Sequence, residues 1–218
     1  MNAPQQHAAG ARLVEVDALR GVAAMAVVLF HYTTRFVDLY GGGAGGPSLS
    51  APYGHFGVNL FFVISGFVIF MTLERTKRPM DFVVSRFSRL FPAYWVAVAV
   101  TFAVVSWAGL PGKEVTGLQA LGNGLMLHGF LGIPHVDGVY WTLQVELFFY
   151  AWMLLLFVTG HLSKVHVALW VFIGVRLLYH VAAVGFGVDL PWRLSQVLIT
   201  NYIPWFALGI CVYQAARK

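Results

Sequence analysis

Six apolar stretches of about twenty residues each constrain the fold of this chain more than any other feature of its sequence. About twenty helical residues cross the hydrocarbon core of a bilayer. The alternating pattern of a membrane β-barrel is absent, so the sequence predicts an all-α, polytopic transmembrane helix bundle with about six spans. The predicted spans are Ala18–Phe36, Gly54–Leu73, Leu90–Leu110, Tyr140–Val158, Val165–Phe186 and Trp192–Tyr213.

The distribution of charge predicts the orientation of these spans. Only 11% of the 218 residues are charged, against about 25% in soluble domains. Basic residues are concentrated between the second and third spans, which places that loop and the N-terminus in the cytoplasm. The net charge of +5 is explained by this topology, so we expect no nucleic-acid partner. The basic residues of the loop are Arg75, Lys77, Arg78, Arg86 and Arg89.

The remaining segments predict a short tail followed by one domain. We expect residues 1–11, which are small and polar, to be a disordered tail, and residues 12–218 to form one transmembrane domain. The first apolar run is too long for a signal peptide, so we expect it to remain as a span. The segment Pro111–Val139 is too apolar for an ordinary loop and too short to span, which is typical of a re-entrant or interfacial piece. The single Cys211 and the histidine spacing predict no disulfide and no metal site.

Arg20 and His31 are polar residues of the first span. Eleven helical residues make three turns plus roughly 20°, so both side chains lie on one face, about 16 Å apart. Ionisable groups in a span are costly to place in lipid and are by default candidates for function. A hydrogen-bonded packing histidine is the alternative interpretation of His31.

Glu146 lies about two turns into the fourth span, at a depth similar to that of His31. A carboxylate and an imidazole at matched depth in different helices can meet, and each lowers the cost of burying the other. Such a carboxylate would fix the histidine tautomer and leave the second ring nitrogen as a general base. A structural bond from Glu146 to Arg20 or Arg176 is the alternative.

Arg86 and Arg89 lie on an amphipathic helix at the cytoplasmic surface. Pro79 and Asp81 are typical of its start, and we expect it to end where Pro92 interrupts it. Phe82, Arg86 and Arg89 share one stripe of this helix, and two guanidiniums one turn apart can hold phosphate oxygens. A plain positive-inside anchor is the alternative.

The second span is rich in small residues. Gly57, Ser65 and Gly66 allow close helix approach, which explains them as packing residues. Asn59 and Ser65 are also weak candidates for stabilising an oxyanion. No G-x-S-x-G elbow, P-loop or dinucleotide-binding glycine pattern is present.

Four blocks in order resemble the acyltransferase-3 family of integral membrane acyltransferases, which includes O-antigen and exopolysaccharide O-acetyltransferases. They are LRGVAAMAVVLFHY, GHFGVNLFFVISGFVI, SRFSRLFPAYW and YWTLQVELFFY. Family members are usually longer, with about ten spans, so the resemblance covers the N-terminal portion of a member or a shortened one.

The resemblance implies transfer of an acyl group, usually acetyl, from acyl-CoA to a hydroxyl of a cell-surface glycan or similar acceptor. The catalytic residues would be His31 and Glu146, and Arg20, Arg86 and Arg89 would handle the donor. It also implies a multi-pass protein of the bacterial inner membrane, with acyl-CoA as a co-substrate and no bound cofactor. A non-enzymatic membrane partner and a proton-coupled transporter using His31 and Glu146 are the competing classes.

Overall fold

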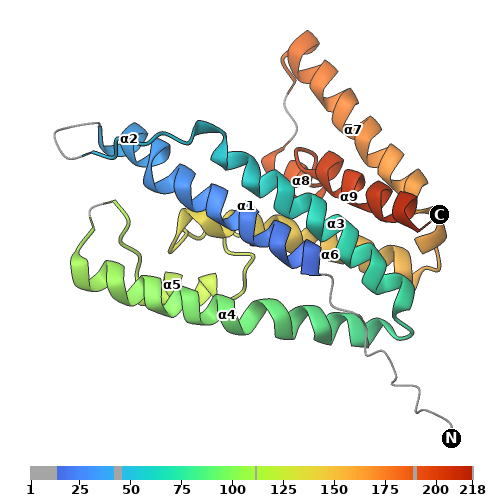
Figure 1. Cartoon of the computed structure of the whole chain (residues 1–218), viewed down its shortest axis with the longest axis horizontal. Helices are drawn as coiled ribbons and strands as arrows, with labels where there is room; N and C mark the ends of the chain where they lie inside the picture. The colour runs from blue at the N-terminus through green and yellow to red at the C-terminus, as the bar shows by residue number, and fades with distance from the viewer. Residues whose placement is uncertain (1–13, 42–45, 111, 189–190, 218) are drawn as a thin grey trace, which may run out of the picture. The chain divides into compact units, whose positions relative to one another are not determined.

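The computed structural model describes residues 14–41, 46–110, 112–188 and 191–217, and within these ranges it contains helices and no strand. The predicted all-α fold is therefore confirmed. Figure 1 shows the helices. They are α1 (Val14–Tyr32), α2 (Thr34–Tyr40), α3 (Gly57–Arg75), α4 (Pro79–Ala108), α5 (Gly117–Asn123), α6 (Trp141–Val158), α7 (Val165–Phe186), α8 (Trp192–Val197) and α9 (Ile203–Ala216), with 3-10 turns η1 (Pro52–Phe56), η2 (Gly138–Tyr140) and η3 (Leu162–Lys164).

Four of the described helices are long and apolar enough to cross a membrane. They are α3, α4, α6 and α7, of which all but α4 are extended by a preceding 3-10 turn. Each contains one of the predicted spans or most of it. The other two predicted spans correspond to α1, whose first turns carry Glu15, Asp17 and Arg20, and to the region of α8 and α9.

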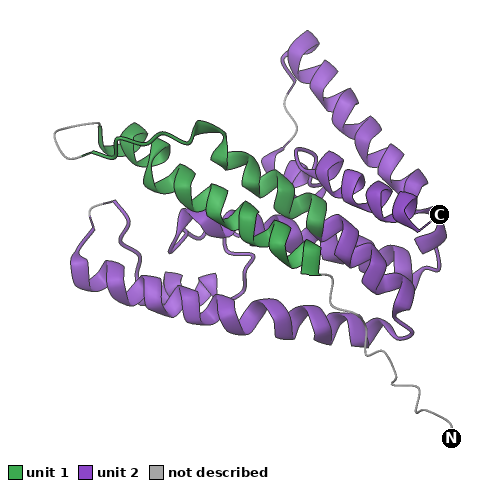
Figure 2. Cartoon of the chain, in the orientation of Figure 1, with its two compact units in different colours: residues 1–64 green, residues 65–218 purple. Residues whose placement is uncertain are grey.

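The chain divides into two compact units, residues 1–64 and residues 65–218 (Figure 2). In the first unit, α1 packs on η1 and on the start of α3 through two glycines. A Cβ atom on Gly57 would lie 2.5 Å from the carbonyl oxygen of Ala23, and one on Gly54 would lie 2.9 Å from Cβ of Phe30. Such distances exclude any side chain, so both glycines are needed for this close approach. The predicted packing role of Gly57 is confirmed.

The first helix ends earlier than the predicted span, which continued to Phe36. α1 ends at Tyr32, because Thr33 has φ −116° and ψ −86° and leaves the helical region. The Thr33 hydroxyl donates to the carbonyl oxygen of Leu29 at 2.6 Å, which occupies an acceptor of the last turn. His31 therefore lies in the last turn of α1 rather than five residues before its end.

In the second unit, α4 is a 30-residue helix that continues through Pro92, so the prediction that Pro92 ends a surface helix was wrong. Proline removes one backbone hydrogen bond, but a helix within a membrane protein tolerates this because neighbouring groups satisfy the freed carbonyl. α4 therefore contains both the predicted surface helix, with Arg86 and Arg89, and the third predicted span. The two arginines are rigidly joined to a membrane-spanning helix.

α6 lies at the centre of the second unit and packs against α4, α8 and α9. The rings of Phe149 on α6 and Phe206 on α9 stack with centroids 4.0 Å apart, and both side chains are fully buried. A Cβ atom on Gly66 of α3 would clash with the backbone of Phe206. Gly66 therefore lets α3 and α9 touch directly, and its predicted packing role is confirmed.

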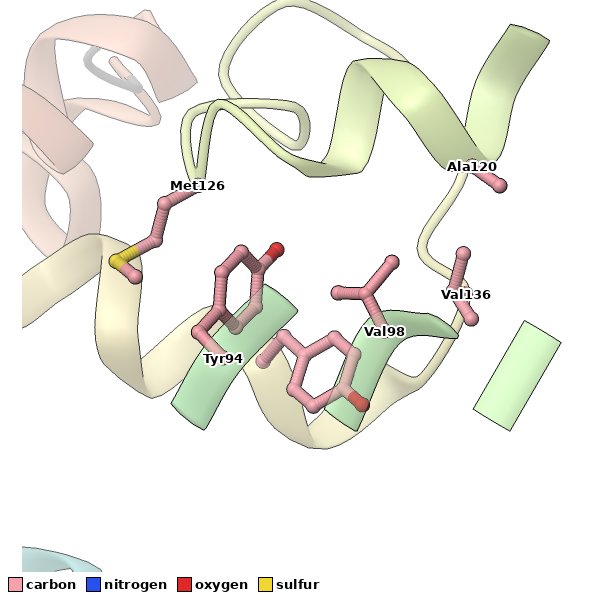
Figure 3. Packing of buried hydrophobic residues seen from close by; sticks show 6 residues of the cluster. Tyr94, Val98, Ala120, Met126 and Val136 are labelled. Atoms are coloured by element: carbon pink, nitrogen blue, oxygen red, sulfur yellow. The ribbon is translucent and has the colours of Figure 1, made fainter. Parts of the chain in front are cut away.

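The segment between α4 and α6 folds against α4 and does not span. α5 begins at Thr116 with a capping box that involves Gln119. Figure 3 shows how side chains from this segment and from α4 project toward one another. The buried cluster consists of Tyr94, Val98, Ala120, Met126, Val136 and Tyr140.

The last predicted span, Trp192–Tyr213, is two helices rather than one, so that boundary prediction was wrong. α8 ends at Val197 and α9 begins at Ile203. Ile199 has φ +44°, which is incompatible with a continuing right-handed helix, and its side chain is 1% exposed. Burial of this side chain, worth about 1.5–3 kcal/mol, offsets a backbone strain of about 1–3 kcal/mol. The periodicity of the sequence did not reveal this break because the turn itself is apolar.

Candidate functional site

Glu146 is the centre of a hydrogen-bonded group in the second unit. Its Oε1 accepts a bond of 2.8 Å from the Ser65 hydroxyl on α3 and one of 2.5 Å from the Tyr150 hydroxyl on α6. The Ser65 and Tyr150 side chains are both 6% exposed, whereas Glu146 is half-buried. Both donors bind the same oxygen, which leaves Oε2 to accept from a further group. The structure thus brings together Ser65 and Glu146, which the sequence had singled out separately.

Arg86 on α4 lies beside this group. Its guanidinium carbon is 5.8 Å from the centroid of the Phe82 ring, and that ring meets the Tyr150 ring edge to face at 6.1 Å. Phe82 is buried and Arg86 is half-buried, so the predicted stripe of Phe82, Arg86 and Arg89 begins on the side of α4 that packs on α6.

The Nε atom of Arg86 is buried and has no hydrogen-bond partner within the part of the chain that the structure describes. A buried donor without a partner costs free energy, about 1–3 kcal/mol for a neutral group and more for a charged one. Arg89 on the same helix is exposed. The pair therefore offers guanidinium hydrogens that an anionic ligand could use.

His31 lies in the first unit and is half-buried in the last turn of α1. Its Nδ1 is 2.9 Å from the carbonyl oxygen of Val27, which can only accept, so Nδ1 carries the hydrogen. In the neutral ring Nε2 then holds the lone pair and can act as a general base. The structure shows this local bond to Val27, which the sequence analysis did not consider, and the predicted bond to Glu146 stays a prediction.

Arg20 and Asn59 also lie in the first unit. Arg20 is paired with Asp17 of the same helix at 4.0 Å, a partner that the sequence analysis did not consider. Asn59 is half-buried on α3. Several roles stay predictions. They are the meeting of His31 with Glu146, the donor role of Arg20, the oxyanion role of Asn59, and the functional roles of Ser65, Arg86 and Arg89.

Tyr150 is the site residue that sequence reasoning missed, although it ends the block YWTLQVELFFY. The signal was its spacing of four residues from Glu146, which places both side chains on one helix face. Arg176, expected to pair within the bundle, donates to the side-chain oxygen of Asn201 at 2.6 Å. That partner lies in the turn between α8 and α9, which the sequence had predicted to be helical.

Comparison with known proteins gives one family and two curated relatives. The family model described as "Acyltransferase domain" matches residues 13–218. Nodulation protein 10 of Rhizobium leguminosarum bv. viciae is 35% identical over 114 residues, which cover 43% of this chain and 30% of that protein. Exopolysaccharide production protein ExoZ of Rhizobium meliloti (strain 1021) is 32% identical over 102 residues, which cover 44% of this chain and 32% of that protein.

The chain therefore covers 30% to 32% of the length of these curated relatives. No solved structure matches it.

Proposed function

Because this chain belongs to the acyltransferase-3 family of integral membrane acyltransferases, we propose that it transfers an acyl group, in the first instance acetyl, from acyl-CoA to a hydroxyl of a cell-surface glycan. The name of ExoZ, an exopolysaccharide production protein, supports a polysaccharide acceptor. The membrane concerned is the bacterial inner membrane, where the cytoplasm supplies acyl-CoA.

The observation that carries the proposal is the unpartnered Nε of Arg86 beside the Glu146 group. Acyl-CoA is anionic through its phosphates and cannot cross a bilayer. By the predicted orientation, Arg86 and Arg89 lie at the cytoplasmic end of α4, where these phosphates arrive. Guanidiniums bind phosphate oxygens with paired hydrogen bonds, and burial beside Phe82 strengthens such bonds.

The reaction exchanges one ester for another. The acceptor hydroxyl attacks the thioester carbonyl, the new C–O bond forms, and the C–S bond to CoA breaks. His31 removes the hydroxyl proton through Nε2, which the Nδ1 bond to Val27 leaves unprotonated, and the proton then passes to the leaving thiolate. General-base assistance is typically worth about 10² to 10⁴ in rate. Ser65 and Tyr150 hold the Glu146 carboxylate in one orientation, and Arg20 assists the donor.

The test is acetyl transfer from labelled acetyl-CoA to envelope polysaccharide by membranes that contain the full chain. We expect His31→Ala to reduce transfer by about 10² or more while membrane insertion is unchanged. We expect Arg86→Ala with Arg89→Ala to raise the KM for acetyl-CoA about tenfold or more and to leave the KM for the acceptor unchanged. Arg75→Ala with Arg78→Ala removes as much charge from the end of α3 and the residue before α4, and is the control.

Full activity of an inserted His31→Ala protein would contradict the assignment of the base. An unchanged KM for acetyl-CoA in the Arg86 and Arg89 variant, or an equal rise in the control, would contradict the docking site. A chain that makes no acylated product, alone or with the remainder of a longer protein, would instead indicate a non-enzymatic membrane partner.

A further inference from the structure

A cavity of about 400 Å³ lies within the second unit and is separate from the Glu146 group. It is formed by the first residues of α6, by Tyr179 on α7, by α8 and the turn after it, and by Gly129 and His135 from the segment before α6. Cavities of this size hold small organic molecules or a sugar residue. None of the predictions made from the sequence used it.

Aromatic rings form much of the cavity wall. Trp141 on α6 and Tyr202 after α8 lie with ring centroids 5.1 Å apart, and Trp192 and Tyr179 add two more rings. Tyrosine and tryptophan combine a large apolar face with a polar hydrogen. Such faces suit a ligand that has an apolar C–H surface and a rim of hydroxyls, as a pyranose does.

Amide side chains supply the polar part of the wall in fixed orientations. Gln144 donates through Nε2 to Oε1 of Gln196 at 2.7 Å and accepts from the backbone N–H of Phe130 at 3.1 Å. Asn201 accepts through Oδ1 from Arg176 at 2.6 Å. Because these oxygens are engaged, the NH₂ groups of Gln196 and Asn201 keep hydrogens that can be donated to a ligand.

The cavity wall is uncharged. None of its described lining residues is Asp, Glu, Lys or Arg, and its one titratable imidazole is His135. His135 Nδ1 lies 2.7 Å from Nε2 of the fully buried His128, and burial lowers the pKa of His135 below the usual value. Two guanidiniums lie next to the wall without lining the cavity: that of Arg176 is bonded to Asn201, and that of Arg193 is 5.3 Å from the centroid of the Trp192 ring. Because the lining side chains are themselves uncharged, the wall favours a neutral ligand.

The backbone around the cavity is held in specific conformations. A Cβ atom on Gly129 would lie 2.9 Å from Cε1 of His135 and 3.0 Å from Oε1 of Gln144, so only glycine lets these two side chains meet there. Ile199, which also lines the cavity, adopts φ +44°. Strained residues of this kind are concentrated at binding sites.

From the cavity of rings and amides at the start of α6, we infer that this chain binds an uncharged sugar residue of the acceptor between Trp141, Trp192 and Gln196. This inference rests on the proposed function and names the class of acceptor. Gln144 and Val145 line the cavity and directly precede Glu146 in the chain. By the predicted orientation the cavity lies toward the outer end of α6, whereas Arg86 and Arg89 lie toward the cytoplasm.

The first measurement is binding without acyl-CoA, which does not depend on activity. The protein in nanodiscs is titrated with cellobiose and with methyl glucuronide, and binding is followed by saturation-transfer NMR. We expect cellobiose to bind weakly, with a Kd of about 1 mM, and methyl glucuronide to bind about tenfold more weakly. Trp192→Leu and Gln196→Leu should each weaken cellobiose binding about tenfold, which corresponds to about 1.4 kcal/mol. The control is Trp170→Leu, a ring on α7 that does not line the cavity and is 71% exposed.

The outcomes separate this inference from the proposed function. Loss of cellobiose binding in both cavity variants, with binding retained in the control, supports the sugar site even if no acetyl transfer is found. If the protein transfers acetyl but binds no saccharide, or binds it equally in all variants, the sugar site is overturned. The proposed function is not affected by that result. Stronger binding of the glucuronide than of cellobiose overturns the preference for an uncharged sugar. Where transfer is measurable, the cavity variants should raise the KM for the acceptor and leave that for acetyl-CoA unchanged.

Discussion

At the scale of residues, Glu146 shows how a half-buried carboxylate is held in an apolar bundle. Two hydroxyl donors satisfy Oε1, one from the same helix and one from α3, while Oε2 is left to accept from a further group. Because the Glu146 side chain is half-buried, water or a ligand can donate to Oε2. The arrangement is compatible with the proposed role of Glu146 in the reaction.

We expect Glu146→Gln to lower kcat for acetyl transfer by about 10² while keeping the fold, because an amide oxygen still accepts from Ser65 and Tyr150 but the negative charge is lost. Tyr150→Phe, which removes one donor and keeps the charge, should have a smaller effect. Combining Glu146→Gln with His31→Ala tests their predicted pairing. If the two act together, the double variant should be no slower than the slower single one. Full multiplication of the two losses would contradict the pairing.

Most of the candidate site residues were singled out from the sequence, whereas the partners that the structure gives them were not. Arg20, His31, Arg86, Arg89 and Glu146 were recognised because ionisable groups in or beside a span are costly. The partners Val27, Asp17 and Tyr150 were not, because each choice depends on rotamers and local geometry that a spacing argument does not fix. Local carbonyls and neighbouring side chains compete with distant groups and often win.

At the scale of elements, two of the wrong boundaries, at Pro92 and within Trp192–Tyr213, have opposite causes. α4 continues through Pro92, where sequence rules predict an end, because one lost backbone bond is tolerated in a long membrane helix. The span predicted over Trp192–Tyr213 is broken, where hydropathy predicts continuity, because Ile199 is buried in a left-handed conformation. Hydropathy reports burial and does not report backbone direction.

The segment between α4 and α6 contains a buried histidine pair that makes its stability sensitive to pH. Burial and the nearby His135 lower the pKa of His128 to about 4, whereas a histidine in an unfolded chain titrates near about 6.5. The Tyr94 hydroxyl oxygen lies 3.5 Å from Nδ1 of His128. The negative charge of Asp137 opposes the lowering of the pKa of His135 by burial. Between these two pH values the unfolded chain binds more protons than the folded one. The stabilisation is therefore complete above pH about 6.5 and is lost as the pH falls toward about 4.

We expect the midpoint of thermal unfolding in detergent to fall between pH 7 and pH 5 for the wild type, and to fall less for His128→Gln, which removes the titrating group. The measurement is tryptophan fluorescence during heating at the two pH values. His166→Gln, an exposed histidine on α7, is the matched control and should behave as the wild type. Equal pH dependence of all three proteins would show that His128 does not control this stability.

At the scale of the whole molecule, the distribution of basic residues predicts which loops face the cytoplasm. In a Cys211→Ser background, Lys113→Cys before α5 should react with a membrane-impermeant maleimide in intact cells. Lys77→Cys, between α3 and α4, should react only after the membrane is opened. Both lysines are exposed, so accessibility within the protein is matched. The reverse labelling pattern would invert the orientation and move Arg86 and Arg89 away from the cytoplasmic donor.

By itself the sequence determined the class of this protein. Apolar stretches of bilayer length admit only helices, and four ordered motifs indicated an acyltransferase whose family membership the comparisons confirmed. Tertiary structure decided which groups meet, namely Ser65 and Tyr150 on Glu146, Arg86 over Phe82, and the rings and amides around the cavity. The physical reason is that burial in lipid depends on composition, which can be read along the chain, whereas a hydrogen bond depends on a few ångströms and a direction that only packed helices fix.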